Sequence, residues 1–185
     1  MQPLLVAFLG GNSGEWTIEK LDVIAGVGLG PASHVRVVEG LNAVEKPAPA
    51  AWVLRGVTSN ERYVGRLQHD ALASRQEGLG RPGSSRAALI PIKKSAAWWD
   101  LPQDERRRIF EDSSHHVELG LECIPAVARR LHHGRDLGEP FDFLTWFEFA
   151  PTAAAGFEEL VHRLRATEEW SYVEHEIDIR LAREG

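Results

Sequence analysis

Three kinds of ionisable side chain that together could serve a haem enzyme lie between residues 113 and 170. The pair His115-His116 offers an imidazole that could hold iron, and the pair Glu168-Glu169 offers a carboxylate that could orient it. Arg129 lies between them in the sequence and could receive an oxyanion, because a guanidinium binds small anions through several N–H groups. The pattern therefore suggests haem chemistry on an anionic substrate.

Each of these residues also has an ordinary structural explanation. On a helix, His116 could be a hydrogen-bonded core histidine, and spacing alone favours that interpretation, although Gly120 one turn later would let a flat macrocycle approach the backbone. In a strand, Arg129 would share a face with apolar residues, where either a bound anion or a buried carboxylate could meet its charge. Glu169 could be a solvated surface carboxylate.

A lysine and several tryptophans are further candidates for the wall of a haem pocket. Lys94 continues the strand face of Ile90 and Ile92 and could reach a haem propionate from the pocket edge, or could be an exposed lysine at a strand end. Trp98 and Trp99 could flank a porphyrin, or could belong to the core.

Composition narrows the class of protein. The chain has 185 residues, a formal net charge of -6 and no basic stripe, which argues against binding to nucleic acid or to an anionic membrane. Cys123 is the single cysteine, so an internal disulfide, a zinc–cysteine cluster and covalent haem attachment through a CxxCH motif are excluded. The apolar residues 3–9 lack a basic flank and end in Gly-Gly-Asn, so we expect a strand there and a cytoplasmic protein.

Residues 86–185 predict the order strand, helix, strand, strand, helix, strand, which is typical of a ferredoxin-like fold. Strands are expected at 87–94, 127–135, 141–149 and 172–181. A broken helical region from about 98 to 122 and a helix at 153–167 would connect them. This half contains all the candidate residues named so far.

Residues 1–85 are less regular. Strands are expected near 3–9, 15–23, 33–39 and 52–58, followed by a helix from about Asn60 to Gln76 that stops at Gly78-Leu79-Gly80. No long linker divides the chain. The economical prediction is a single α+β domain, 1–185, of two fused ferredoxin-like halves, with the N-terminal half (1–85) abbreviated and the C-terminal half (86–185) complete.

Short motifs through the C-terminal half resemble the chlorite dismutase family, and in particular its short, dimeric lineage. They include Ser114-His115-His116, Arg129 after Ala128, and Thr167-Glu168-Glu169-Trp170. The resemblance covers that half closely and continues thinly upstream at 54–57, 62–64 and 78–81. The matching segments are 86–99, 104–107, 109–112, 114–116, 124–126, 128–129, 135–136, 138–148 and 164–170.

The resemblance implies a dimeric α+β barrel with non-covalent haem b that converts chlorite to chloride and dioxygen. By matching position, His116 would bind the iron, Glu169 would accept a hydrogen bond from the other ring nitrogen, and Arg129 would hold chlorite and then the chlorine oxyanion. The other positions implied for the haem pocket are Gln76, near the arginine, and Lys94, Ile90 and Trp99. A homodimer is also implied.

Four alternatives remain open at the level of sequence. A ferric haem beside an anionic imidazole partner could act as a peroxidase. Relatives that decarboxylate coproheme are usually longer and are associated with a catalytic tyrosine in place of the arginine, and this chain has only Tyr63 and Tyr172. The chain could also be a non-enzymatic haem-binding protein, or a haem-free interaction module.

Overall fold

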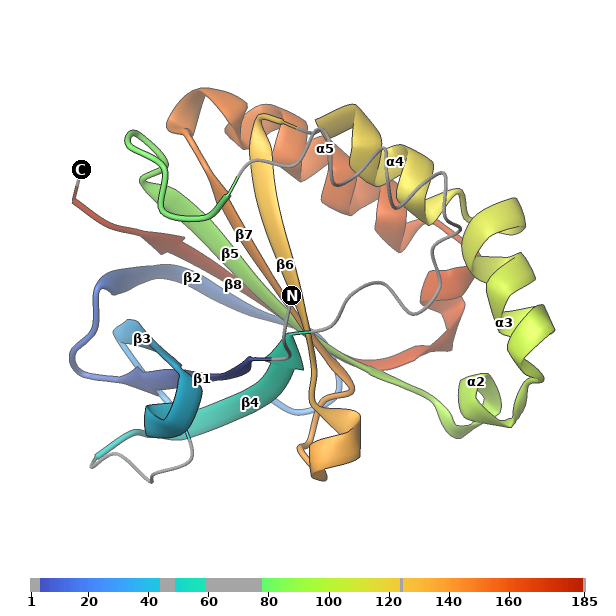
Figure 1. The fold of residues 1–185 in the computed structure, drawn as a ribbon, viewed down its shortest axis with the longest axis horizontal. Coiled ribbons are helices and arrows are strands. Elements are labelled where there is room, and N and C mark those ends of the chain that lie inside the picture. Colours follow the sequence, from blue (N-terminus) through green and yellow to red (C-terminus); the bar gives the residue numbers. More distant parts are fainter. Residues whose placement is uncertain (1–3, 44–48, 59–77, 124, 185) are drawn as a thin grey trace.

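The computed structural model describes residues 4–43, 49–58, 78–123 and 125–184. Within them, the strands form a closed barrel with the order β1-β3-β2-β8-β5-β7-β6-β4, and neighbouring strands pair antiparallel (Figure 1). The strands are β1 (Leu5–Gly11), β2 (Trp16–Ala25), β3 (His34–Glu39), β4 (Trp52–Thr58), β5 (Arg86–Lys94), β6 (Val127–His133), β7 (Phe143–Phe149) and β8 (Val173–Ala182).

The helices of the described chain lie mostly in its C-terminal half. There α4 and α5 run beside one another along the outer side of the barrel, next to β6 and β7 (Figure 1). The longer helices are α2 (Ala96–Asp100), α3 (Gln103–Arg108), the π-helical turn η2 (Ile109–Ser113), α4 (His116–Cys123) and α5 (Ala154–Arg165). The short 3-10 turns are η1 (Gly40–Ala43), η3 (Arg135–Leu137), η4 (Pro151–Ala153) and η5 (Glu169–Tyr172).

Both halves of the barrel have the same strand order. The neighbours in the C-terminal half are β8-β5-β7-β6 and those in the N-terminal half are β4-β1-β3-β2, so in each the fourth, first, third and second strands lie in that sequence. In the C-terminal half α2 to α4 and then α5 make the two crossings, as the antiparallel split βαβ arrangement requires. Between β1 and β2, residues 12–15 connect the strands without a helix.

The two faces of the sheet serve two different cores. Alternate residues of a strand point to opposite faces, so Leu89 of β5 faces the barrel interior, whereas Ile90 faces the helices. The interior core draws on both halves of the chain. The second core lies between the C-terminal strands and α5, where Phe157 and Val161 are buried. The face of β5, β6 and β7 that points away from the barrel is therefore the one covered by helices.

Most predicted elements are confirmed. The chain is an α+β protein, and each strand lies within a few residues of its predicted range. The broken helical region is divided into α2, α3, η2 and α4. The predicted helix near 60–76, with Gln76, lies outside the described residues. No described helix is both long and apolar enough to cross a membrane.

Phe157 should be a sensitive point for stability, because its fully buried ring attaches α5 to the sheet. Its ring centroid lies 5.0 Å from that of Phe147 and 4.6 Å from that of Phe149. We expect Phe157→Ala to lower the free energy of unfolding by about 3–5 kcal/mol, as measured by urea denaturation. The exposed neighbour Glu159, changed to Ala, should stay within about 0.5 kcal/mol of the parent. Equal losses in both variants would contradict this packing.

Candidate functional site

A pocket lies between the helix-covered face of the sheet and the helices above it. Its walls are largely aliphatic and aromatic, with a few polar groups among them, as is usual for a cofactor site. The sheet contributes Ile90, Ile92, Lys94, Val127, Arg129, Leu131, His133, Phe143, Thr145 and Phe147. The helical side contributes Trp98, Phe110, His116, Val117, Gly120, Cys123, Leu160, Val161, Leu164, Glu169 and Trp170.

His116 enters the pocket as the first residue of α4. The preceding residue, His115, has φ of 49°, a left-handed conformation that histidine adopts more readily than most residues and that lets the chain turn from η2 into α4. The ring of Phe110 stacks on the His116 imidazole, with centroids 4.4 Å apart and planes at 22°. Stacking and helix position together fix the imidazole.

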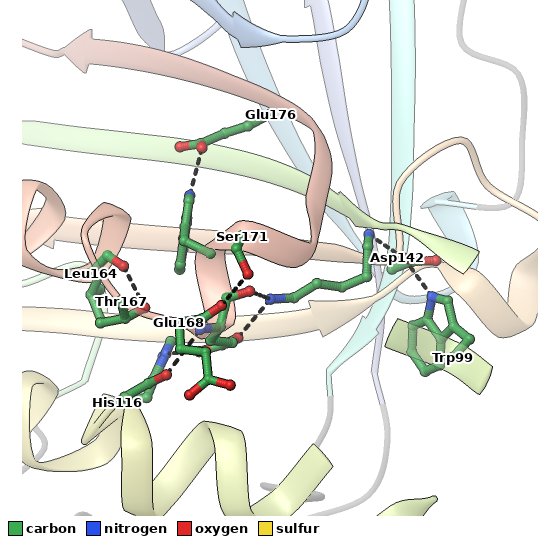
Figure 2. A network of polar contacts seen from close by, with 12 residues as sticks. Trp99, His116, Asp142, Leu164, Thr167, Glu168, Ser171 and Glu176 are labelled. Carbon is green, nitrogen blue, oxygen red and sulfur yellow. Dashed lines mark hydrogen bonds and ion pairs between the residues drawn. The ribbon is translucent and has the colours of Figure 1, made fainter. Parts of the chain in front are cut away.

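The carboxylate of Glu169 sets the orientation of that imidazole. Nδ1 of His116 lies 2.8 Å from Oε2 of Glu169, and because an ionised carboxylate only accepts, Nδ1 carries the proton and donates (Figure 2). Nε2 is then the ring nitrogen with a lone pair, available to bind a metal. The predicted pairing of these two residues, 53 positions apart, is present in the structure.

Lys94 extends the buried contact between His116 and Glu169 to a third side chain. Its Nζ donates to Oε1 of Glu169 at 2.9 Å and to the backbone oxygen of Glu169 at 3.1 Å, and its side chain is only 1% exposed. The same Nζ lies 4.7 Å from the ring centroid of Trp98 and 5.5 Å from that of Trp170. The ammonium is thus surrounded by one carboxylate and two indole rings.

These contacts hold Glu169 ionised despite its burial. Burial alone would raise the pKa of Glu169, but the imidazole of His116 and the ammonium of Lys94 lower it to about 2. Burial lowers the pKa of Lys94, and Glu169 opposes that shift. In addition, the backbone N–H of Glu169 donates to Oγ of Ser114 at 3.0 Å. The carboxylate therefore stays negative beside the imidazole at physiological pH.

Two further carboxylates form hydrogen bonds around the interacting side chains of His116, Glu169 and Lys94. Oδ2 of Asp142 accepts from the backbone N–H of Lys94 at 2.7 Å and from Nε1 of Trp99 at 3.2 Å (Figure 2). Nε1 of Trp170 donates to Glu176 at 2.7 Å. Together with the Lys94–Glu169 pair, these contacts connect β5, α2 and β8 to η5, the turn that carries Glu169.

Arg129 lines the same pocket from β6. Its neighbour Arg130 points to the other face of the strand, where it pairs with Glu39 at 2.6 Å. The period-two prediction for Arg129 is therefore confirmed as to its face. The pocket brings together an imidazole anchored on the helical side and a guanidinium on the sheet side.

The remaining predicted residues occupy different positions. Ile90 lines the pocket. Trp99 stacks behind the pocket residue Phe143, with centroids 6.1 Å apart, while Trp98 faces the pocket. Lys94 extends toward Glu169 and does not stand at an exposed strand end. Gln76 lies outside the described residues.

Sequence reasoning missed Phe110 and His133 in the pocket wall. His133 could have been found, because it lies four residues after Arg129 in the same strand and therefore on the same face. Phe110 gave no comparable signal, because the π-helical turn that aims its ring at His116 is not readable from residue spacing.

The pocket residues fit a haem. The imidazole of His116 offers Nε2 to the pocket, and the walls are mainly apolar. At Gly120, one helical turn after His116, an added Cβ would meet no atom within 4 Å, so the space above that backbone is open. This observation agrees with the expectation that a flat macrocycle could lie close to α4 at that glycine.

Comparison with known proteins decides the family. A family model described as chlorite dismutase matches residues 42–184. The chain belongs to the chlorite dismutase family. A chlorite dismutase from Ideonella dechloratans is 31% identical over 97 residues, which cover 51% of this chain and 33% of that protein, so the alignment spans about a third of the relative.

Solved structures of chlorite dismutases have the same fold. A crystal structure of dimeric chlorite dismutase from Nitrobacter winogradskyi is 55% identical, with a TM-score of 0.89, and the match covers 97% of this chain and 99% of that one. Chlorite dismutase from Candidatus Nitrospira defluvii in complex with imidazole is 19% identical, with a TM-score of 0.68 over 97% and 91% of the two chains. The latter likeness concerns the fold alone.

The Glu169 site of this chlorite dismutase-family chain predicts a specific pH dependence. Because the folded pKa lies below the ordinary value, the carboxylate contributes stability that is fully present above about pH 5 and is lost as the pH falls toward about 2. In the haem-free protein, Glu169→Gln should lower the free energy of unfolding at pH 7 by roughly 3 kcal/mol, because the Lys94 ammonium loses its counter-charge.

Urea denaturation at a series of pH values checks both parts. Between about pH 5 and about pH 2 the parent should lose stability more steeply than Glu169→Gln, whereas the exposed neighbour variant Glu168→Gln should follow the parent. Identical pH slopes in the parent and Glu169→Gln would show that Glu169 titrates normally.

Proposed function

We propose that this protein is a haem b-dependent chlorite dismutase that converts chlorite to chloride and dioxygen. One observation carries the proposal. A single pocket of a chlorite dismutase-family chain holds an imidazole fixed to a carboxylate, with Nδ1 of His116 2.8 Å from Oε2 of Glu169, and a guanidinium, that of Arg129, on the facing wall. The 55% identical chlorite dismutase from Nitrobacter winogradskyi supports it.

His116 would hold the haem iron through Nε2, and the apolar side chains of β5, β7 and α5 would pack against the porphyrin. When bound, haem supplies the redox chemistry by which oxygen leaves chlorine. The carboxylate of Glu169, accepting from Nδ1, increases the electron donation of the imidazole and so favours the ferric state. Lys94 keeps that carboxylate ionised and in place.

Arg129 would bind the anionic substrate. The whole chain carries a net charge of -6, so attraction of chlorite requires a local positive group in the pocket. A guanidinium offers several N–H donors in one plane and can hold chlorite, and then the chlorine oxyanion, through the same contacts. The largely apolar walls limit access of water and strengthen that attraction. Retention of the oxyanion allows both oxygen atoms to leave together as dioxygen.

The proposal also covers the oligomeric state, the division of the fold into two halves, and the location of the protein. A homodimer is supported by the relative from Nitrobacter winogradskyi, which is dimeric. The description as two fused ferredoxin-like halves, divided near residue 85, is supported by the strand order that both halves share. A cytoplasmic location stays a prediction.

Replacing Arg129 should separate haem binding from substrate retention. In Arg129→Ala we expect normal haem uptake but faster bleaching during turnover, because the chlorine oxyanion escapes and attacks the haem. Trapping of hypochlorite should rise, and the initial rate of chlorite decay should fall by roughly 10²-fold or more. Arg130→Ala, on the opposite face of β6, is the matched control and should behave as the parent. Unchanged chlorite decay and hypochlorite trapping in Arg129→Ala would refute the role.

Replacing His116 should remove the iron ligand. His116→Ala, supplemented with hemin, should lack the Soret band of the parent complex, because among the described residues Glu169 holds the imidazole of His116 and no other. His115→Asn is the control, since asparagine tolerates the left-handed conformation at that exposed position. A normal Soret band in His116→Ala, with loss of that band in His115→Asn, would assign the ligand to His115.

A further inference from the structure

The sheet wall of the pocket is a regular grid of side chains. On β6, the residues facing the pocket pair with those of β7, which pair in turn with those of β5. The rows across the wall are Arg129-Phe147-Ala88, Leu131-Thr145-Ile90 and His133-Phe143-Ile92. The two ends of the pocket wall along the strands can therefore be told apart: one lies at the row of Arg129 and the other at the row of His133.

Beyond Arg129, the grid ends in apolar contacts. The preceding residue on the same face of β6 is Val127, which pairs with Phe149, and Phe149 stacks on Phe157 of α5 at a centroid distance of 4.6 Å. All three side chains are buried. Two guanidinium groups lie near this end, and both are paired with carboxylates of the protein. Arg86, which pairs with Phe149 across the sheet, forms an ion pair with Glu19, and Arg180, 4.7 Å from the ring centroid of Phe157, forms ion pairs with Glu158 and Asp178.

The opposite end is basic. His133 is buried there and lies four residues from Arg129, about 13 Å along the strand. In the same row, Phe143 stacks on Trp99. Two guanidinium groups contact the Trp99 ring. That of Arg135 lies 3.6 Å and that of Arg106 lies 5.5 Å from the ring centroid. Three basic side chains therefore gather around one row of the grid.

Carboxylates also lie near this end. Asp142 precedes β7, and its Oδ2 accepts from Nε1 of Trp99 and from the backbone N–H of Lys94. These bonds use N–H donors and leave the guanidinium groups of Arg135 and Arg106 beside the ring. Asp136 follows Arg135 in η3, so two carboxylates, Asp142 and Asp136, lie near the three basic groups and reduce the basic character of the row without cancelling it.

Haem carries two propionate carboxylates on one edge, and a carboxylate at the end of an apolar pocket needs N–H donors or cations. We propose that His133 donates a hydrogen bond to a haem propionate and that the exposed Arg135 adds positive potential at the same end. The propionate edge then points along β6 toward η3, and the apolar edge of the haem lies toward Val127 and Phe149. This inference rests on the proposed function and adds the direction in which the haem lies.

Haem with esterified propionates tests the proposal. The rate of haem loss to excess apomyoglobin is measured for native haem and for haem dimethyl ester, in the parent and in His133→Phe. Native haem should leave His133→Phe roughly tenfold faster than the parent, because a hydrogen bond to a charged group is lost. Loss of the dimethyl ester should change by less than about twofold, because the ester has no carboxylate to bind.

Matched variants separate the hydrogen bond from packing. Thr145→Val removes an uncharged polar group from the pocket wall one row nearer the centre of the grid, and it should change the two rates by the same factor. His133→Gln keeps an N–H donor and should recover most of the parent's hold on native haem. Arg135→Gln changes an exposed residue, so folding is preserved, and it should speed the loss of native haem about twofold to threefold at low salt and less at high salt.

Two results would overturn the assignment of the propionate edge. Equal acceleration of both porphyrins in His133→Phe would mean that the ring only fills space. Unchanged loss of native haem in both His133→Phe and Arg135→Gln would mean that the propionates point elsewhere. Failure of the parent to take up either porphyrin is a different result, because it would refute the proposed haem function itself.

Discussion

The buried ion pair between Lys94 and Glu169 is the constraint on which the site depends. Either charge alone would be too costly at less than 6% side-chain exposure, so each is retained because the other is present. The pair joins the end of β5 to η5, and the second oxygen of Glu169 reaches across to α4 and fixes the imidazole of His116. Three segments that are distant in the sequence are thereby held in one geometry, and these contacts give the imidazole a defined orientation.

The sheet gives this arrangement its opposite wall. The same strands fill the barrel with one set of side chains and line the pocket with the alternate set, so strand register decides which residues face the pocket. A one-residue slip of β6 would replace Arg129 by Arg130 in the pocket and would turn His133 into the barrel. The antiparallel pairing of β6 with β7 along its whole length prevents such a slip. The position of the guanidinium is thus a consequence of the fold and not of a flexible loop.

Most strands and helices could be predicted from the sequence, because strand alternation and turn residues mark them. The alternation of side chains along β6 also places Arg129 on an apolar face. Resemblance to relatives paired His116 with Glu169, which spacing alone could not do. The buried role of Lys94 could not be predicted, since its partner lies 75 residues away and the strand pattern shows only which face it shares. The resemblance implied Trp99 for the pocket, whereas Trp98 lines it, and this difference could not be predicted either. Adjacent residues of the short helix α2 point in different directions, and only the packed structure shows which of the two faces the pocket.

The central claim is that one pocket, with His116 on one wall and Arg129 on the other, keeps a chlorine oxyanion until its oxygen atoms have joined. Chlorite labelled with 18O on both oxygens, given to the haem-loaded protein in unlabelled water, tests it directly through the mass of the dioxygen released. The account predicts dioxygen that carries both labels from one chlorite ion. Dioxygen with a single label, or no dioxygen at all from a protein with a normal haem spectrum, would contradict it.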